Sequence, residues 1–272
     1  MSPTIRSPHN PRLKAARRLL HRKGRRAQGR FLVEGLTHIA AALEAGGWLE
    51  TLFWSPERLT SAFGRDMVRR AARAGAEVVE VAATALDTLS PREHSQGLVA
   101  VARQRYRALD MLRPKAAAWV VAVVQPQDPG NLGALWRTLD AAGATGPVLL
   151  DGGVDPFHPT AVRASLGALF WHPPVAATWD DLTAWARGHG YALYGSSAHG
   201  TVDYRAAGYR FPAVLVLGNE RRGLSPAQRE ACAAVVRIPM TGHVRSLNLA
   251  IAAGLLLYAM REALPPRPSA SA

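Results

Sequence analysis

Residues 238–258 read IPMTGHVRSLNLAIAAGLLLY, and this stretch decides the fold class. An apolar strand ends at residues 238–240, a polar loop follows, and Ser246 and Asn248 open a helix that is apolar on every side. Ser246 is a suitable N-cap, and Asn248 is placed to face inward. A helix without a polar face has to be buried, either in a core or against a second subunit. A strand that leads into such a helix is typical of an α/β protein.

Two further segments repeat this arrangement of apolar strand, polar turn and helix. They are QPQDPGNLGALWRTLDAAGA at residues 125–144 and LVLGNERRGLS at residues 215–225. Where the strands of a parallel sheet end and helices begin, the backbone is presented to small ligands. The three segments together predict one binding site at the carboxyl edge of a parallel sheet.

Five residues of these two segments are candidates for roles in that site. Asn131 is either a helix N-cap or a site residue. Arg137 lies among apolar positions, where a guanidinium has to be paired or to face a ligand phosphate. Gly218 and Gly223 permit close backbone approach. Glu220 suits a positively charged ligand better than a phosphate, and its alternative role is to cap the next helix.

The composition points to a polyanionic partner. The chain has 272 residues and a formal net charge of +13, carried almost entirely by arginine. Arginine binds phosphates in a bidentate fork and stacks on bases, which suits RNA. A GC-rich codon bias is an equal explanation for arginine over lysine, but it does not explain the excess of positive charge.

Other classes of protein are disfavoured by what the sequence lacks. The single cysteine, Cys232, excludes an intramolecular disulfide and a cysteine-based zinc cluster, and the scattered histidines give no metal-ligand spacing. No G-x-G-x-x-G or P-loop pattern is present. No segment has the character of a membrane span or a signal peptide, so we expect a cytoplasmic protein without a metal.

Composition divides the chain into four regions. We expect a small α/β domain at residues 1–102, a basic linker at 103–117, a larger α/β domain at 118–264 and a disordered tail at 265–272. The first domain is expected to contain helices at 11–22, 36–43 and 65–74 and strands at 30–33, 49–54, 77–81 and 98–102. The second is expected to contain strands at 119–124, 148–150, 192–195, 213–217 and 235–238 and helices at 132–142, 159–169, 179–188, 227–231 and 247–261.

The three segments, in this order and spacing, resemble the signature motifs of the SpoU (TrmH) family of RNA ribose 2′-O-methyltransferases of the SPOUT superfamily. The resemblance covers residues from 119 to the end of the chain. It implies a parallel sheet with a deep trefoil knot, a homodimer, and S-adenosylmethionine as the cofactor. It also implies a set of catalytic residues: Asn131, Arg137, Glu220, Ser246 and Asn248. The cofactor-binding residues that it implies are Leu217, Gly218, Asn219, Ile238, Met240, Ser246 and Leu247.

The N-terminal region is the expected RNA-binding domain. SPHNPRLKAARRL followed by GRFLVEG resembles the small substrate-binding domain, similar to ribosomal protein L30e, that often precedes these methyltransferases. No acidic residue precedes Glu34, so the basic helix is expected to contact the phosphate backbone. Arg163 and Ser165 begin a later helix, where they either bind an RNA phosphate or form an exposed helix start. The expected RNA-binding residues are Arg12, Lys14, Arg17, Arg18, Arg22, Lys23, Arg163 and Ser165.

The implied reaction is attack of a ribose 2′-hydroxyl on the methyl group of the cofactor. The pKa of arginine lies above about 12, so we favour a charged Arg137 that clamps a phosphate over a neutral Arg137 that acts as the base. Glu220 would relay the proton or orient Arg137. Ribosomal RNA, most readily 23S, is favoured over transfer RNA because the N-terminal domain resembles those of ribosomal RNA enzymes. The alternatives are a catalytically silent RNA-binding protein of this fold, a base methyltransferase, or a nucleotide-dependent enzyme of related topology.

Overall fold

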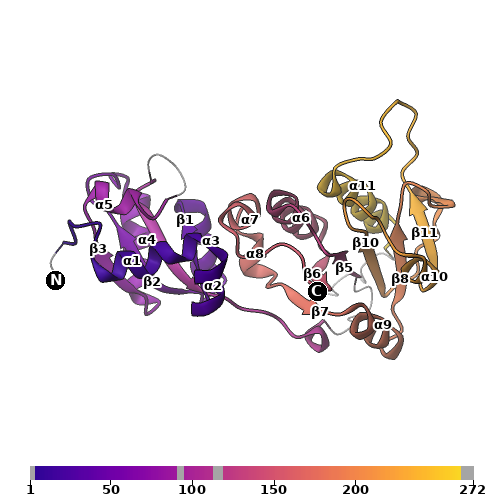
Figure 1. The fold of residues 1–272 in the computed structure, drawn as a ribbon, viewed down its shortest axis with the longest axis horizontal. Coiled ribbons are helices and arrows are strands. Elements are labelled where there is room, and N and C mark those ends of the chain that lie inside the picture. The colour runs from indigo at the N-terminus through magenta and orange to yellow at the C-terminus, as the bar shows by residue number, and fades with distance from the viewer. Residues whose placement is uncertain (1–3, 91–94, 113–118, 265–272) are drawn as a thin grey trace, which may run out of the picture. The chain divides into compact units, whose positions relative to one another are not determined.

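The computed structural model describes residues 4–90, 95–112 and 119–264. The chain forms two compact units (Figure 1). The first consists of Met1–Arg105 and Asp155–Trp171, and the second of Tyr106–Val154 and His172–Ala272. The predicted tail and residues 113–118 of the predicted linker lie outside the described residues.

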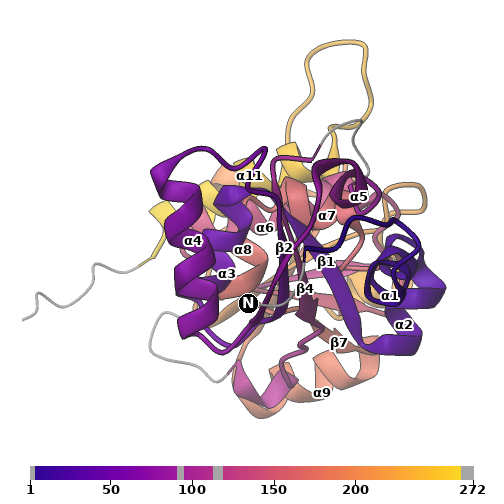
Figure 2. The same cartoon turned by 90° about the vertical axis from the view of Figure 1, so that its left-hand side faces the viewer.

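The first unit is a four-stranded sheet covered by helices on both faces. The strand order is β1 (Arg30–Glu34), β4 (Leu98–Arg103), β2 (Leu49–Trp54) and β3 (Glu77–Glu80). β4 is antiparallel to both of its neighbours, and β2 and β3 are parallel. α1 (Pro11–Arg17) and α2 (Arg22–Gln28) lie on one side of the sheet, and α3 (Leu36–Glu44) and α4 (Ala62–Arg73) lie on the other (Figure 2). A short α5 (Ala83–Asp87) follows β3.

The prediction of a single basic helix at residues 11–22 is wrong. Asn10 caps α1 as expected, but a 3-10 turn follows at Arg18–Leu20, and α2 begins after His21, whose backbone is extended. The buried side chain of Arg25 stabilises this break. Its Nη1 donates to the carbonyls of Leu19 and Leu20 at 2.9 Å each, which satisfies acceptors that a continuous helix would have used.

Residues 155–171, predicted in the second domain, pack within the first unit. Their aromatic rings explain why: Phe157 and Phe170 stand against Phe31 of β1 with centroids 4.7 and 6.4 Å away. The helix predicted at 159–169 is also broken, into α7 (Pro159–Ala164) and α8 (Ala168–Trp171). Leu166 and Gly167 separate them because both have positive φ angles, 48° and 96°.

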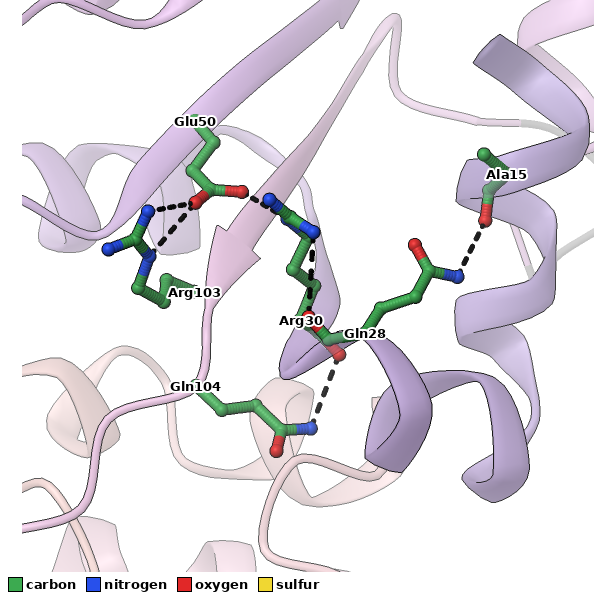
Figure 3. Close-up of polar contacts among 6 residues, drawn as sticks. All are labelled: Ala15, Gln28, Arg30, Glu50, Arg103 and Gln104. Atoms are coloured by element: carbon green, nitrogen blue, oxygen red, sulfur yellow. Dashed lines mark hydrogen bonds and ion pairs between the residues drawn. The ribbon is translucent and has the colours of Figure 1, made fainter. Parts of the chain in front are cut away.

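A polar network joins β1, β2 and β4 at one end of this sheet (Figure 3). Arg30 and Arg103 stand opposite each other on β1 and β4. The carboxylate of Glu50 accepts from Nε of Arg30 and from Nε and Nη2 of Arg103, the latter two at 2.9 and 2.8 Å. One carboxylate therefore holds two arginines that would otherwise repel each other across the strands.

The second unit is an α/β layer structure around a parallel sheet, as predicted, but the sheet has seven strands where five were expected. The strand order is β7 (Val175–Ala177), β6 (Thr145–Leu150), β5 (Trp119–Val124), β10 (Ala213–Leu217), β8 (Ala192–Ser196), β11 (Ala234–Arg237) and β9 (Val202–Asp203). β5 and β10 are buried along their whole length. α9 (Trp179–Gly188) packs on one face, and α6 (Pro129–Ala142) and α11 (Leu249–Glu262) pack together on the other (Figure 1). α10 (Pro226–Glu230) precedes β11.

The strand order places a switch point between β5 and β10. From β5 the chain continues outward through β6 and β7, whereas β8 and β11 lie on the far side of β10. Ligands of parallel α/β sheets bind outside the carboxyl ends of strands that flank such a point. The trefoil knot stays a prediction from the family resemblance.

Candidate active site

A cavity of about 510 Å³ lies at the carboxyl edge of the seven-stranded sheet. Its walls come from the loops after β8, β10 and β11, and from residues at the beginning of α6 and α11. It is lined by ten of the predicted site residues: Asn131, Leu217, Gly218, Asn219, Glu220, Ile238, Met240, Ser246, Leu247 and Asn248. The three sequence motifs therefore meet in one place.

The loop after β10 owes its shape to Gly218 and Asn219. A Cβ atom on Gly218 would lie 2.7 Å from the carbonyl carbon of Gly223, so only glycine lets the two arms of the loop close. Asn219 is 6% exposed. Its Nδ2 donates to the carbonyl of Gln125 at 2.8 Å, and its Oδ1 accepts from the amides of Arg221 and Arg222 at 3.0 and 3.1 Å. Its side-chain amide is thus used to hold the loop.

Glu220 is bound to the segment that precedes α6. Its carboxylate accepts from the amide of Gln127 at 3.1 and 3.2 Å and from that of Asp128 at 3.5 Å. The alternative role, capping the following helix, is wrong because Ser225 caps α10 through a capping box with Gln228. The carboxylate is fixed at the cavity by backbone donors.

An amide pair joins the first and third motifs. Nδ2 of Asn248 donates to Oδ1 of Asn131 at 2.7 Å. Neither helix uses the cap expected from the sequence. Asp128 caps α6 by accepting from the amide of Asn131, and Asn248 caps α11 by accepting from the amide of Ala250. Ser246 instead lies before α11, on the wall of the cavity.

The chemistry of the lining fits S-adenosylmethionine. Leu217, Ile238, Met240 and Leu247 supply an apolar wall suited to a flat heterocycle. Glu220 is the single carboxylate among the described lining residues, and a carboxylate stabilises a sulfonium charge. The cavity volume lies in the range of sites for ligands of this size, about 300–1,000 Å³.

Arg137 does not line this cavity. Its side chain is exposed on α6 and forms no ion pair with any residue that the structure describes, and the hydrogen bonds of Glu220 go to Gln127 and Asp128 instead. The expectation that it is enclosed by buried neighbours is wrong, because α6 exposes residues 137, 140 and 141 on one side. From Asn131 its Cα lies about 9 Å along the helix and about 120° around it.

Several lining residues were not predicted. Ser196 ends β8, and Ser197 and His199 follow it. Arg222 and Arg245 come from the loops already described, and Arg229 comes from α10. The loop after β8 carries no recognisable motif. It reaches the cavity because β8 pairs with β10, with Ser196 beside Leu217, and sequence order does not reveal that pairing.

The predicted RNA-binding residues of the first unit differ in exposure. Lys14, Arg18, Arg22, Lys23 and Arg163 are exposed. Arg12 is also exposed and pairs with Glu77 at 2.7 Å. Arg17 is half-buried and donates to the carbonyl of Pro8 and the hydroxyl of Thr88.

Ser165 does not fit a role in RNA binding. Its side chain is fully buried, and its hydroxyl donates to the carbonyl of Val162 at 2.7 Å and accepts from the amide of Gly167 at 3.3 Å. It stabilises the turn between α7 and α8, so the prediction of a phosphate contact is wrong for this residue.

Within the described ranges, no His, Cys, Asp or Glu side chains gather in a group of three or more that could hold a metal ion. Over the same residues, no helix has the length and apolar character needed to cross a membrane.

Two family models match the two parts of the chain. The model of the SpoU rRNA methylase family matches residues 118–258, and that of the MRM3-like substrate binding domain matches residues 10–100. The chain is 33% identical over 267 residues to a 23S rRNA (uridine(2479)-2′-O)-methyltransferase of Streptomyces viridochromogenes, covering 95% of this chain and 92% of that protein.

Solved structures of similar proteins support the same family assignment. An AdoMet-bound rRNA methyltransferase from Sinorhizobium meliloti has a TM-score of 0.87 at 34% identity, covering 97% of this chain and 99% of that one. The SpoU methyltransferase AviRb from Streptomyces viridochromogenes, in complex with AdoMet, has a TM-score of 0.84 at 32% identity, covering 93% and 98% of the two chains. The family predicted from the three motifs is thus confirmed: the chain belongs to the SpoU rRNA methylase family and is an RNA methyltransferase.

Proposed function

We propose that this enzyme transfers the methyl group of S-adenosylmethionine to a ribose 2′-hydroxyl of 23S ribosomal RNA, in the cytoplasm. The observation that carries the proposal is the meeting of Asn131, Glu220 and Asn248 with an apolar wall in one cavity at the carboxyl edge of the sheet. The Streptomyces relative, matched over almost the whole chain, is named for this reaction on this RNA.

The cofactor would be held mainly by the loops after β10 and β11. Leu217, Ile238, Met240 and Leu247 enclose its heterocycle, and Gly218 with Asn219 sets the path of the backbone around it. The cofactor supplies a methyl group already activated by the positive sulfur. The protein has to align the ribose hydroxyl with that methyl group and to remove its proton.

Glu220 is the acceptor for that proton. Its carboxylate lies at the cavity and is fixed by the amides of Gln127 and Asp128, so little reorganisation is needed when charge moves. The Asn131–Asn248 pair and the hydroxyl of Ser246 position the ribose. Arg137 contributes as a charged phosphate clamp from a second subunit, since it is exposed and does not line the cavity of its own chain.

A homodimer supplies that second subunit. α11 buries Ala253, Leu256, Leu257 and Met260, but its other face leaves Ile251, Leu255 and Tyr258 at 58%, 40% and 45% exposure. These three residues follow the i, i+4, i+7 spacing of one helix face. α11 packs against the Asn131 side of α6, next to the side that carries Arg137. A second copy that covers α11 would therefore also reach Arg137.

Calorimetric titration with S-adenosylhomocysteine tests the cavity as the cofactor site. Gly218→Ala adds one methyl group that collides with the backbone at Gly223, so we expect it to weaken binding more than tenfold. Leu217→Met conserves volume and should leave the affinity within about threefold. Equal affinity of the alanine variant and the unmodified chain would exclude this cavity.

A further inference from the structure

Arg222 is an exposed arginine that two contacts hold at the cavity. It lies in the loop after β10 and is among the residues that line the cavity. Its backbone amide donates to Oδ1 of Asn219 at 3.1 Å, and its Nη2 donates to Oε1 of Gln125. Exposed arginine side chains ordinarily sample many rotamers, and the bond to Gln125 restricts this one at the cavity.

Gln125 links three loops of the carboxyl edge. Its backbone carbonyl accepts from Nδ2 of Asn219, and its backbone amide donates to the carbonyl of Leu150 at 3.0 Å. Its side-chain Nε2 donates to the carbonyl of Asp151 at 3.3 Å. Its φ angle is 43°, a conformation that few residues other than glycine adopt and that the surroundings have to enforce. Gln125 therefore presents its side chain to Arg222 from a rigid base.

The charge of Arg222 stays available. Its partner Gln125 is a neutral amide, and the nearby carboxylate of Glu220 is bound to the backbone amides of Gln127 and Asp128. Among the described residues, no acidic side chain forms an ion pair with Arg222. A guanidinium that is oriented by a neutral acceptor keeps its full charge and its remaining N–H donors for a ligand.

A ribose whose 2′-hydroxyl enters this cavity brings the adjoining phosphodiester to its mouth. Arg137 of the same chain does not line the cavity, whereas Arg222 does. We propose that Arg222, positioned by Gln125, binds the RNA phosphate next to the ribose that is methylated. The inference rests on the proposed function and identifies the part of the substrate that this loop contacts. Arg222 would be the binding residue, and Gln125 a positioning residue that acts through it.

The test compares Arg222→Gln with a matched control, Arg187→Gln, an exposed arginine on α9 that does not line the cavity. The probe is a 23S ribosomal RNA transcript, and its affinity is measured between about 50 and 200 mM salt. Loss of one phosphate contact should lower the affinity about tenfold and reduce the slope of log affinity against log salt by roughly 0.7–0.9. KM for RNA should rise while the affinity for S-adenosylhomocysteine is unchanged.

Gln125→Met and the double variant test the positioning role. Gln125→Met removes the acceptor but keeps the side-chain length, and we expect KM for RNA to rise about threefold with kcat retained. The double variant should be no worse than Arg222→Gln alone, because Gln125 acts through Arg222. Additive losses would assign Gln125 an independent structural role and contradict its part in the inference.

Three outcomes would overturn the role of Arg222. One is an Arg222→Gln variant with the RNA affinity and salt slope of the Arg187→Gln control. The second is a loss of affinity for S-adenosylhomocysteine alone, which would place the carboxylate of the cofactor on Arg222. The third is an equal loss in both arginine variants, which would indicate a general charge effect. Failure of the unmodified chain to bind S-adenosylhomocysteine or to methylate the RNA would instead contradict the proposed function.

Discussion

Arg25 belongs to the basic N-terminal segment by sequence but to the core by structure. It is 1% exposed, and its Nε donates to Asp155 at 2.7 Å while Nη1 binds two carbonyls. A sequence with eight basic residues between positions 12 and 26 does not reveal which of them is buried. The other members of the segment are exposed or half-buried.

Arg25→Met should therefore reduce stability rather than RNA binding alone. Removing one partner leaves Asp155 and two carbonyls without their donor, which typically costs about 3–5 kcal/mol for a buried pair. Urea denaturation measures the free energy of unfolding. Arg26→Met, at the exposed neighbouring position, is the control and should change it by less than about 0.5 kcal/mol. Equal stability of the two variants would contradict a structural role for Arg25.

Glu50 gives the first unit a pH-dependent contribution to stability. Partial burial raises the pKa of its carboxyl, but the hydrogen bonds and charges of Arg30 and Arg103 outweigh burial and hold the pKa below the ordinary value of 4.5. A lowered pKa stabilises the folded state above pH 4.5, and this contribution disappears as the pH falls through the folded-state pKa.

The stability difference between the unmodified chain and Glu50→Gln should accordingly be largest near neutral pH. It should shrink in acid as the carboxyl of Glu50 is protonated. Denaturant titrations at about pH 7 and about pH 3.5 measure it. A difference that stays constant or grows in acid would show that the Glu50 carboxylate does not stabilise the fold through its charge.

At the scale of elements, the apolar pattern was enough for two fully buried strands and for one helix with a clear apolar face. β5, β10 and α9 match the predicted ranges to the residue. Element starts were less predictable: α6 begins at Pro129 rather than at residue 132, because Asp128 and not Asn131 is the cap. The breaks in the helices near His21 and Leu166 are stabilised by local contacts of Arg25 and Ser165 with carbonyls three to six residues earlier, and a hydrophobic pattern does not show such contacts. β7, β9 and α5 were not predicted, because segments this short carry little pattern.

The exposed face of α11 carries a prediction about assembly. Ile251→Asp with Leu255→Asp places two charges on the face that a second copy would cover, so we expect a monomer. Light scattering after size-exclusion chromatography measures the mass, and turnover should fall more than tenfold if the second subunit supplies Arg137. Glu262→Gln, at the exposed end of the same helix, is the control and should remain a dimer. A doubly charged variant that still dimerises would place the interface elsewhere.

At the scale of the whole molecule, the sequence predicted which residues line the cavity. It did not predict the hydrogen-bond partners of those residues. Ten predicted residues line it, because motifs at strand ends share one edge of a parallel sheet. Arg137 does not line the cavity of its own chain, and one sequence does not show which side of α6 is covered by α11. The packing of residues 155–171 within the first unit was not predicted either, since it depends on Phe157 and Phe170 meeting Phe31.

The proposed sharing of the active site between two subunits makes a prediction that only the assembled molecule tests. Arg137→Ala and Glu220→Ala should each be inactive, but co-expression of the two should restore about a quarter of the activity. Half of the dimers are then mixed, and each mixed dimer keeps one cavity with both residues. Activity in the RNA methylation assay that stays at the level of the single variants would show that Arg137 serves its own chain or none.

The most direct test of the whole account is the position of the transferred methyl group. 23S ribosomal RNA is incubated with the enzyme and with S-adenosylmethionine labelled on its methyl group, and the product is hydrolysed in alkali. The account predicts that the label appears in alkali-resistant dinucleotides, because a 2′-O-methyl group removes the hydroxyl that cleaves the adjoining phosphodiester. Label in mononucleotides would indicate methylation of a base, and would contradict the ribose chemistry assigned to the cavity of Asn131, Glu220 and Asn248.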